Sequence, residues 1–154
     1  SAADALCAQI RASGGEAIAV QGDVSSEEHV AEMFERFAAK FGRVDILVAN
    51  AGITIDAPAA RMTLAAWRRV LDVNLTGQFL CAREAIRRFQ SQAPTPLSRA
   101  AGKIVCMSSV HEVIPWAGHV NYAASKGGVQ LTPHGGLVDH PSRFGLVIQR
   151  FRVQ

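Results

Sequence analysis

SSVHEVIPWAGHVNYAASK, residues 108–126, is the most informative stretch of this chain. It places Tyr122 and Lys126 four residues apart, so on a helix the phenol and the ammonium lie on the same face. A nearby ammonium favours the phenolate, and such a tyrosine can exchange a proton with an alcohol or a carbonyl. Ser109 follows the apolar run Ile104–Met107, which is typical of a buried parallel strand. Its hydroxyl is therefore expected where open α/β sheets bind ligands.

Each part of this pattern also has a plain structural interpretation. Surface helices often carry a tyrosine and a lysine at this spacing, and a serine after a strand is commonly a cap or a turn residue. The combination is more specific, because a strand ending in Ser108 and Ser109 leads through a short loop to Tyr122 and Lys126. With the segments SSVHEVIPW and NYAASKGG, it resembles the short-chain dehydrogenase/reductase family, and within it bacterial glucose 1-dehydrogenases.

The resemblance implies an NAD- or NADP-dependent oxidation of a sugar or a secondary alcohol, with glucose as the expected substrate. It implies Tyr122 as the general base and Lys126 as the cation that stabilises the phenolate and contacts the nicotinamide ribose. Ser109 is expected to hydrogen-bond the substrate oxygen. Asn74, in the sequence Asn-Leu-Thr-Gly, is expected to help hold a water linked to the lysine. From its position alone, Asn74 is equally well a structural residue at a helix kink.

The segment from His111 to Trp116 favours glucose over the alternative substrate, a 3-oxoacyl thioester. Both of these side chains could equally serve to pack the loop. Two further segments are similar to cofactor-binding motifs of the family. Asn50, Ala51 and Gly52 end an apolar run and are expected beside the cofactor, although a plain turn is the simpler interpretation of the tripeptide alone. Asp23 and Val24 are similar to the pair that contacts the adenine.

Composition, charge and cysteine content limit the classes of protein to which this chain can belong. The 154 residues suffice for one domain, and the composition, 49% hydrophobic and 19% charged, is that of an ordinary globular protein. The net charge of +3 is spread over helices without a nucleic-acid motif, so no nucleic-acid partner is expected. Three cysteines, with no metal-ligand spacing to the histidines, are expected to be free thiols, and no metal site is expected. No apolar run is long enough for a membrane span and no signal peptide is evident, so a cytoplasmic location is expected.

Hydrophobic periodicity predicts alternating strands and helices. We expect an uncapped helix over residues 1–13, a buried strand at 17–20, and a helix capped by Ser25 with Glu28 in a capping box. A central strand at 45–52, a long helical pattern at 64–90 and a strand at 102–107 follow. The fold class is α/β, a Rossmann-like parallel sheet with helices on both faces, lacking the first strands and the C-terminal strand or strands. Five apolar residues are expected to line one face of the long helical pattern: Leu64, Trp67, Leu71, Leu75 and Phe79.

The resemblance has limits at both ends. No Gly-rich phosphate loop occurs in these residues, and Pro133 breaks the helix that carries Lys126. We expect residues 1–132 to be a partial dinucleotide-binding and catalytic domain, and residues 133–154 an atypical tail in which 144–148 could form a strand. The alternative function is therefore a catalytically inactive fragment or interaction module. Family members pair through helices corresponding to residues 71–90 and 120 onward, and the shortened second helix argues against such a homo-oligomer.

Overall fold

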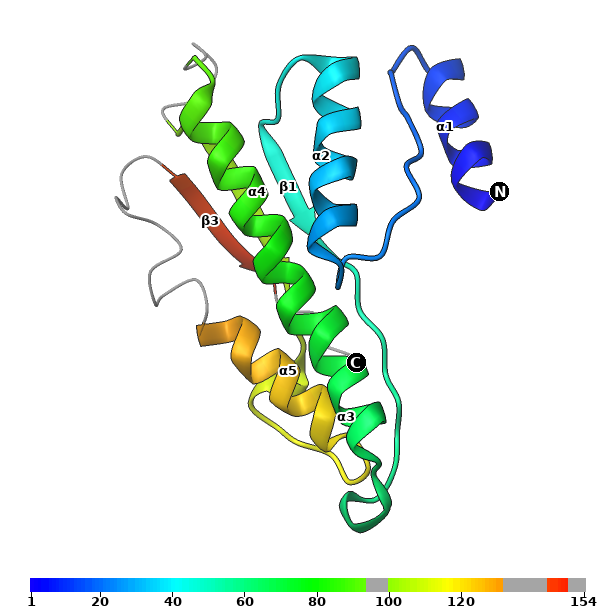
Figure 1. Ribbon diagram of the computed structural model, residues 1–154, viewed down its shortest axis with the longest axis vertical. Helices are drawn as coiled ribbons and strands as arrows, with labels where there is room; N and C mark the ends of the chain where they lie inside the picture. Colours follow the sequence, from blue (N-terminus) through cyan, green and yellow to red (C-terminus); the bar gives the residue numbers. More distant parts are fainter. Residues whose placement is uncertain (94–99, 132–143, 150–154) are drawn as a thin grey trace.

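The structure is a computed structural model that describes residues 1–93, 100–131 and 144–149. Figure 1 shows helices in front of the strands and below them. The longer elements are α1 (Ala2–Ala12), α2 (Glu27–Phe41), β1 (Ile46–Ala49), α3 (Leu64–Leu71), α4 (Gly77–Ser91), β2 (Gly102–Met107), α5 (Val120–Leu131) and β3 (Phe144–Gln149). Shorter helical turns lie at η1 (Ala59–Arg61), η2 (Asp72–Thr76) and η3 (Val110–Glu112).

The sheet is parallel, with the strand order β1-β2-β3. Ile104 and Cys106 of β2 are buried, as predicted for a strand inside a parallel sheet. The prediction that the strand at 45–52 is central is wrong for the described residues, because β1 lies at one end of the strand order. Ile46 and Val48 of β1 are 59% and 56% exposed, so this end of the sheet presents an apolar edge.

The predicted strand at 17–20 is absent, and these residues are not buried. A short extended run gains ladder hydrogen bonds only beside another strand, and the described part of the chain places no strand next to this one. In Figure 1 the segment runs between α1 and α2, and Ile18 and Val20 line one hollow together with Ile46 and Val48 of β1. Its apolar side chains Ile18 and Val20 still face Met33 and Phe34 of α2 across a hollow of about 310 Å³.

Two helix caps differ from the sequence-based expectation. Ser1 caps α1 in a capping box, because its hydroxyl accepts the Asp4 N–H and the Asp4 carboxylate accepts from the Ser1 backbone nitrogen. The cap of α2 is Ser26 rather than Ser25, and its hydroxyl accepts from the backbone of His29. Ser25 instead donates to Asp23, which removes it from the capping position.

The long helical pattern is continuous but not regular. Between α3 and α4, the η2 turn is π-helical, and one extra residue per turn rotates the following face. The predicted apolar face is therefore wrong, because Leu64 and Phe79 at its ends are 59% and 40% exposed. The buried residues of α3, η2 and α4 are instead Val70, Val73, Asn74, Gly77, Gln78, Leu80, Cys81, Ala82, Ala85 and Phe89.

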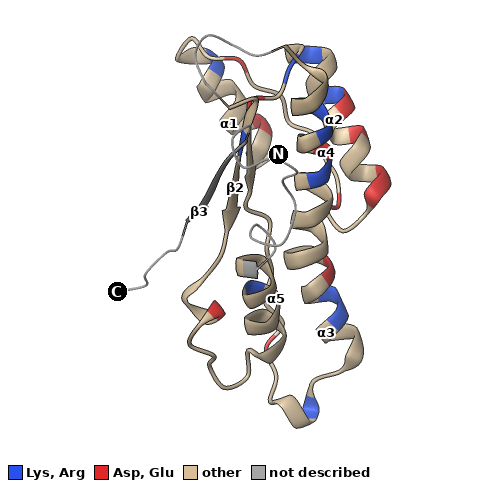
Figure 2. Ribbon diagram, turned by 90° about the vertical axis from the view of Figure 1, so that its left-hand side faces the viewer, with Lys and Arg blue, Asp and Glu red and all other residues tan. Residues whose placement is uncertain are grey.

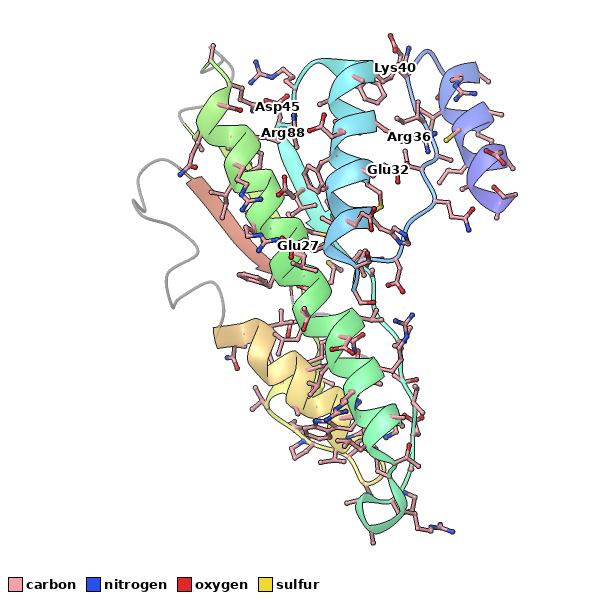
Figure 3. All side chains as sticks on the ribbon, in the orientation of Figure 1. Glu27, Glu32, Arg36, Lys40, Asp45 and Arg88 are labelled. Carbon is pink, nitrogen blue, oxygen red and sulfur yellow. The ribbon has the colours of Figure 1, made fainter. Side chains whose placement is uncertain are left out.

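The core lies between the sheet and the layer formed by α2 and α4, which Figure 2 shows on one side of the strands. Phe89 of α4 packs closely on Gly102, where an added Cβ would lie 2.3 Å from its ring. Ion pairs from α4 to α2, Arg83 to Glu27 and Arg88 to Glu35, border this packing. Figure 3 labels one member of each pair, Glu27 on α2 and Arg88 on α4. Exposed pairs of this kind contribute about 0–1 kcal/mol each, so apolar burial dominates the packing of the two helices.

The residues after Leu131 are described only at β3. This strand confirms the expectation of a strand near 144–148, and it pairs in parallel with β2. The predicted division of the chain at residue 132 stays a prediction, since residues 132–143 and 150–154 lie outside the described part. Among the described helices, none has the length and apolarity that crossing a membrane requires.

Candidate active site

Helix α5 begins where two loops meet. Asn121 at its first turn is fully buried; its amide donates to the Ile55 carbonyl at 2.9 Å, and its oxygen accepts from the Tyr122 backbone at 2.8 Å. These bonds tie the first turn of α5 to the connection between β1 and α3. Tyr122 and Lys126 follow one turn apart, and the Lys126 Nζ lies 5.6 Å from the centroid of the Tyr122 ring. The prediction that Tyr122 and Lys126 are neighbours on one helix is therefore confirmed.

Lys126 is buried, with 3% of its surface exposed. Its Nζ donates to the carbonyl oxygen of Met107, the last residue of β2, at 2.7 Å. Burial removes water from the ammonium and lowers the pKa of Lys126 below its ordinary value, an effect that the neighbouring Cys106 partly opposes. A buried ammonium of this kind needs acceptors, and Met107 supplies one for its three N–H donors.

Asn74 sits in the π-helical η2 turn and is fully buried. Its amide oxygen accepts from the Ile53 N–H at 2.8 Å, and its amide nitrogen donates to the Ile53 carbonyl at 2.9 Å and to Ser125 Oγ at 3.1 Å. Ser125 in turn donates to the Tyr122 carbonyl at 2.7 Å. Asn74 thus links the loop after β1 to the turn of α5 between Tyr122 and Lys126.

Gly52 brings the end of the Asn-Ala-Gly segment close to the same group. A Cβ atom at Gly52 would lie 3.4 Å from the Asn74 amide oxygen and 3.8 Å from Lys126 Nζ. The structure therefore joins Gly52, Asn74 and Lys126, three residues that the sequence singled out separately. Asn50 and Ala51, in contrast, are exposed just beyond the end of β1.

The two serines after β2 have different environments. Ser108 is buried and donates to Glu112, and its hydroxyl also lies 3.4 Å from the Lys126 carbonyl. Ser109 caps η3, where its hydroxyl accepts from the His111 N–H at 3.3 Å, and it is only partly buried. Of the two, Ser109 has the more accessible hydroxyl.

Four rings cluster beside this serine. The His111 ring centroid lies 4.8 Å from that of Trp116, 5.6 Å from His119 and 5.8 Å from Tyr122. His119 Nε2 also lies 3.7 Å from Asp56 in the connection between β1 and α3. The loop 110–119 therefore reaches the Tyr122 ring through His111.

Asp23 and Val24 have other partners among the described residues. The Asp23 carboxylate accepts from the Ser25 backbone and hydroxyl and pairs with Arg69 of α3 at 3.2 Å. The Ser25 hydrogen bonds, helped by Arg69, lower the pKa of Asp23 to about 2. Val24 packs against Gly77 at the start of α4, where an added Cβ would lie 2.8 Å from it.

Sequence reasoning missed three contributors to the site. Ser125 is fully buried between Asn74 and the Tyr122 carbonyl, and its place inside the Tyr-Ala-Ala-Ser-Lys run was the available signal. Gln78 is buried on α4 and donates to the Met107 carbonyl at 3.2 Å, so that this carbonyl accepts from both Gln78 and Lys126. The Met107 carbonyl itself carries no side-chain signal in a sequence.

The sequence model of the short chain dehydrogenase family matches residues 1–135. This chain belongs to the short-chain dehydrogenase family. It is 47% identical over 122 residues to a 3beta-hydroxysteroid dehydrogenase of Eggerthella lenta, covering 79% of this chain and 44% of the relative. A 3-oxoacyl-[acyl-carrier-protein] reductase of Synechocystis is 43% identical, and a glucose 1-dehydrogenase of Bacillus subtilis is 36% identical; they cover 84% and 85% of this chain and 49% of each relative.

Solved structures agree with the family. A short chain dehydrogenase of Mycobacterium smegmatis superposes with a TM-score of 0.76 at 34% identity, covering 84% of this chain and 51% of that one. The expected Rossmann-like parallel sheet is thereby confirmed. This short-chain dehydrogenase spans about half the length of the curated relatives that it matches.

Proposed function

We propose that this chain carries the proton-transfer part of an NAD(P)-dependent oxidoreductase site that interconverts a secondary alcohol and a carbonyl. The observation that carries the proposal is the buried Lys126 ammonium, fixed by the Met107 carbonyl and placed 5.6 Å from the Tyr122 ring centroid. Within residues 1–93, 100–131 and 144–149 the ammonium has no ionic partner, and burying such a cation is costly, so its position supports a function beyond stability.

Tyr122 takes the proton from the substrate hydroxyl at its phenolic oxygen. Lys126 stabilises the phenolate through its charge, and the Met107 carbonyl keeps the ammonium on the Tyr122 side of α5. Ser109 donates its hydroxyl hydrogen to the substrate oxygen and balances charge that develops there. Asn74 and Ser125 hold the turn of α5 on which Tyr122 and Lys126 stand, so they position the proton-transfer groups.

The residues present fit the nicotinamide end of an NAD(P) cofactor. Lys126 keeps N–H donors beyond the one that Met107 accepts, and the glycine at position 52 leaves the backbone open beside that ammonium. These groups would hold the ribose next to the nicotinamide, and the bound cofactor supplies the hydride acceptor. No Gly-rich phosphate loop occurs in residues 1–154, so the fit covers the nicotinamide end of the cofactor.

The substrate follows less directly from the relatives. Their names include a hydroxysteroid, a 3-oxoacyl group and glucose, which share an alcohol or carbonyl carbon as the reacting centre. The segment from His111 to Trp116 favours glucose as the substrate. The roles proposed for Tyr122, Lys126 and Ser109 require only a secondary alcohol or the matching carbonyl.

The test is turnover with NAD⁺ and NADP⁺ in excess, for a panel of glucose, a cyclic secondary alcohol and, in the reverse direction with reduced cofactor, an acetoacetyl thioester. Formation or consumption of reduced nicotinamide with one of these substrates supports the proposal. The absence of turnover with every substrate and both cofactors would instead favour the alternative, an inactive fragment. That alternative draws on the missing phosphate loop and on the half-length match to the relatives.

A further inference from the structure

Helix α4 buries a glutamine against the end of β2. Gln78 is the second residue of α4, directly after the π-helical η2 turn, and only 6% of its surface is exposed. Glutamine is mostly found at protein surfaces, because an amide that is taken out of water must be hydrogen-bonded again. The contacts of this amide should therefore explain why a glutamine stands here.

The Gln78 amide is only half satisfied in the part of the chain that the structure describes. Its nitrogen donates to the Met107 carbonyl at 3.2 Å. Its oxygen is buried and has no hydrogen-bond partner among the described residues. An unpaired buried acceptor lowers stability, and an apolar side chain of the same shape would avoid that loss. Packing and stability therefore do not account for a glutamine at this position.

The Met107 carbonyl connects Gln78 to Lys126. The Lys126 Nζ donates to the same oxygen at 2.7 Å, and a carbonyl oxygen has two lone pairs with which it can accept from both side chains. Only the nitrogen of the Gln78 amide can face Met107, because an amide oxygen there would oppose the carbonyl. The Gln78 nitrogen and the Lys126 ammonium are therefore neighbours, no farther apart than the two donor–acceptor distances together.

The direction of the Met107 carbonyl depends on what holds the end of β2. Met107 is the last residue of that strand, and the chain continues into the loop that carries Ser109. Helix α4 packs against β2, so the bond from Gln78 holds this carbonyl from the helix side. Lys126 reaches the carbonyl through four flexible carbons, and the direction of its acceptor therefore decides where the ammonium rests beside the Tyr122 ring.

We propose that Gln78 is a positioning residue for Lys126: it holds the Met107 carbonyl in the direction that keeps the ammonium beside Tyr122. The inference rests on the proposed function, because it takes the placement of Lys126 beside Tyr122 as the property on which proton transfer depends. Gln78 acts through the Met107 carbonyl and needs no contact with substrate or cofactor. A displacement of about 1 Å in an active site can lower a rate about a hundredfold, so a small movement of the ammonium is enough.

The position of the Lys126 ammonium can be measured without turnover. The chain has three lysines, Lys40, Lys103 and Lys126, so isotopic labelling of the lysine ε carbon gives three proton–carbon correlations in a nuclear magnetic resonance spectrum. They are assigned with Lys40→Arg and Lys103→Arg. The Lys126 ammonium lies over the Tyr122 ring, whose ring current shifts nearby protons, so this correlation reports where the side chain rests. Lys103 lies in β2 and reports any wider change in that strand.

The variant Gln78→Met removes the amide and keeps the length of the side chain. We expect it to shift the Lys126 correlation, to leave those of Lys40 and Lys103 in place, and to leave the urea midpoint unchanged or raised, because the unpaired acceptor is gone. With the best substrate of the panel, kcat should fall by about tenfold or more while KM stays within about twofold. Gln90→Met introduces the same side chain at an exposed position of α4 and should change none of these quantities.

A second variant, Gln78→Glu, keeps the shape of the side chain but replaces the donor by a carboxylate, which repels the Met107 carbonyl and attracts the ammonium. It should also move the Lys126 correlation, and it serves as the test if Gln78→Met does not fold. A Lys126 correlation that stays in place in both variants would overturn the inference, as would equal shifts of all three lysines with a lowered urea midpoint. A shifted Lys126 without any turnover by the parent protein would keep Gln78 as the residue that places Lys126 and remove the proposed function. Full turnover by Gln78→Met would remove the positioning role and keep the proposed function.

Discussion

Replacing Asn74 by alanine removes the hydrogen bonds that connect the loop after β1, the η2 turn and α5. The side chain is fully buried and makes three of them, two with the Ile53 backbone and one with Ser125 Oγ. At about 0.5–1.5 kcal/mol each, their loss predicts a decrease of roughly 2–4 kcal/mol in the free energy of unfolding. Urea denaturation followed by far-ultraviolet circular dichroism measures this decrease.

The variant Asn74→Asp distinguishes the hydrogen bond that the Asn74 oxygen accepts from the two that its amide nitrogen donates. It keeps the oxygen that accepts from Ile53 but places an oxygen opposite the Ile53 carbonyl and Ser125, so we expect substantial destabilisation here too. Asn50→Ala is the matched control, since Asn50 is exposed at the end of β1, and its effect should stay within about 0.5 kcal/mol. A loss below about 1 kcal/mol for Asn74→Ala would refute the structural role of these bonds.

Three further predictions follow from other parts of the chain. Asp23 has a pKa of about 2, below its ordinary 3.8, so its stabilising effect is present above that ordinary value and is lost as the pH falls through about 2. Asp23→Asn should lower the urea midpoint near neutral pH, and the difference from the parent protein should close as the pH falls through that window; a constant difference would contradict this. Burial raises the pKa of Cys81 to about 11 and also raises the pKa of Cys106, so both thiols should react with iodoacetamide far more slowly than in urea; equal rates would show that they are accessible. Ile46→Lys places a charge on the exposed edge strand and should reduce association at high concentration, as measured by light scattering, with unchanged scattering arguing against the edge as the contact.

The local features of the site could be predicted from the sequence because they depend on neighbours along the chain. The spacing of Tyr122 and Lys126 fixes their shared helix face, and the apolar run before Ser108 fixes the strand from which the loop emerges. The helix expected after Ser25 was predictable for the same reason, and it is α2.

Features that depend on distant partners could not be predicted. Asn74 finds its partners 21 and 51 residues away, and the π-helical turn that buries it also shifts the apolar face of α4. The run at 17–20 has the composition of a strand, but a strand requires a neighbour, and the described sheet offers none beside it. The edge position of β1 is a property of that sheet, which its apolar sequence does not reveal.

Tyr122 bears the central claim, because it is the residue proposed to take the proton from the substrate hydroxyl. The most direct measurement compares the parent protein with Tyr122→Phe, using the best substrate of the panel and recording both turnover and binding of NADH. We predict that the substitution abolishes turnover while NADH binding stays largely unchanged, since Lys126 and Gly52 remain in place. Substantial turnover by Tyr122→Phe would contradict the assignment of Tyr122 as the base and, with it, the proposed function.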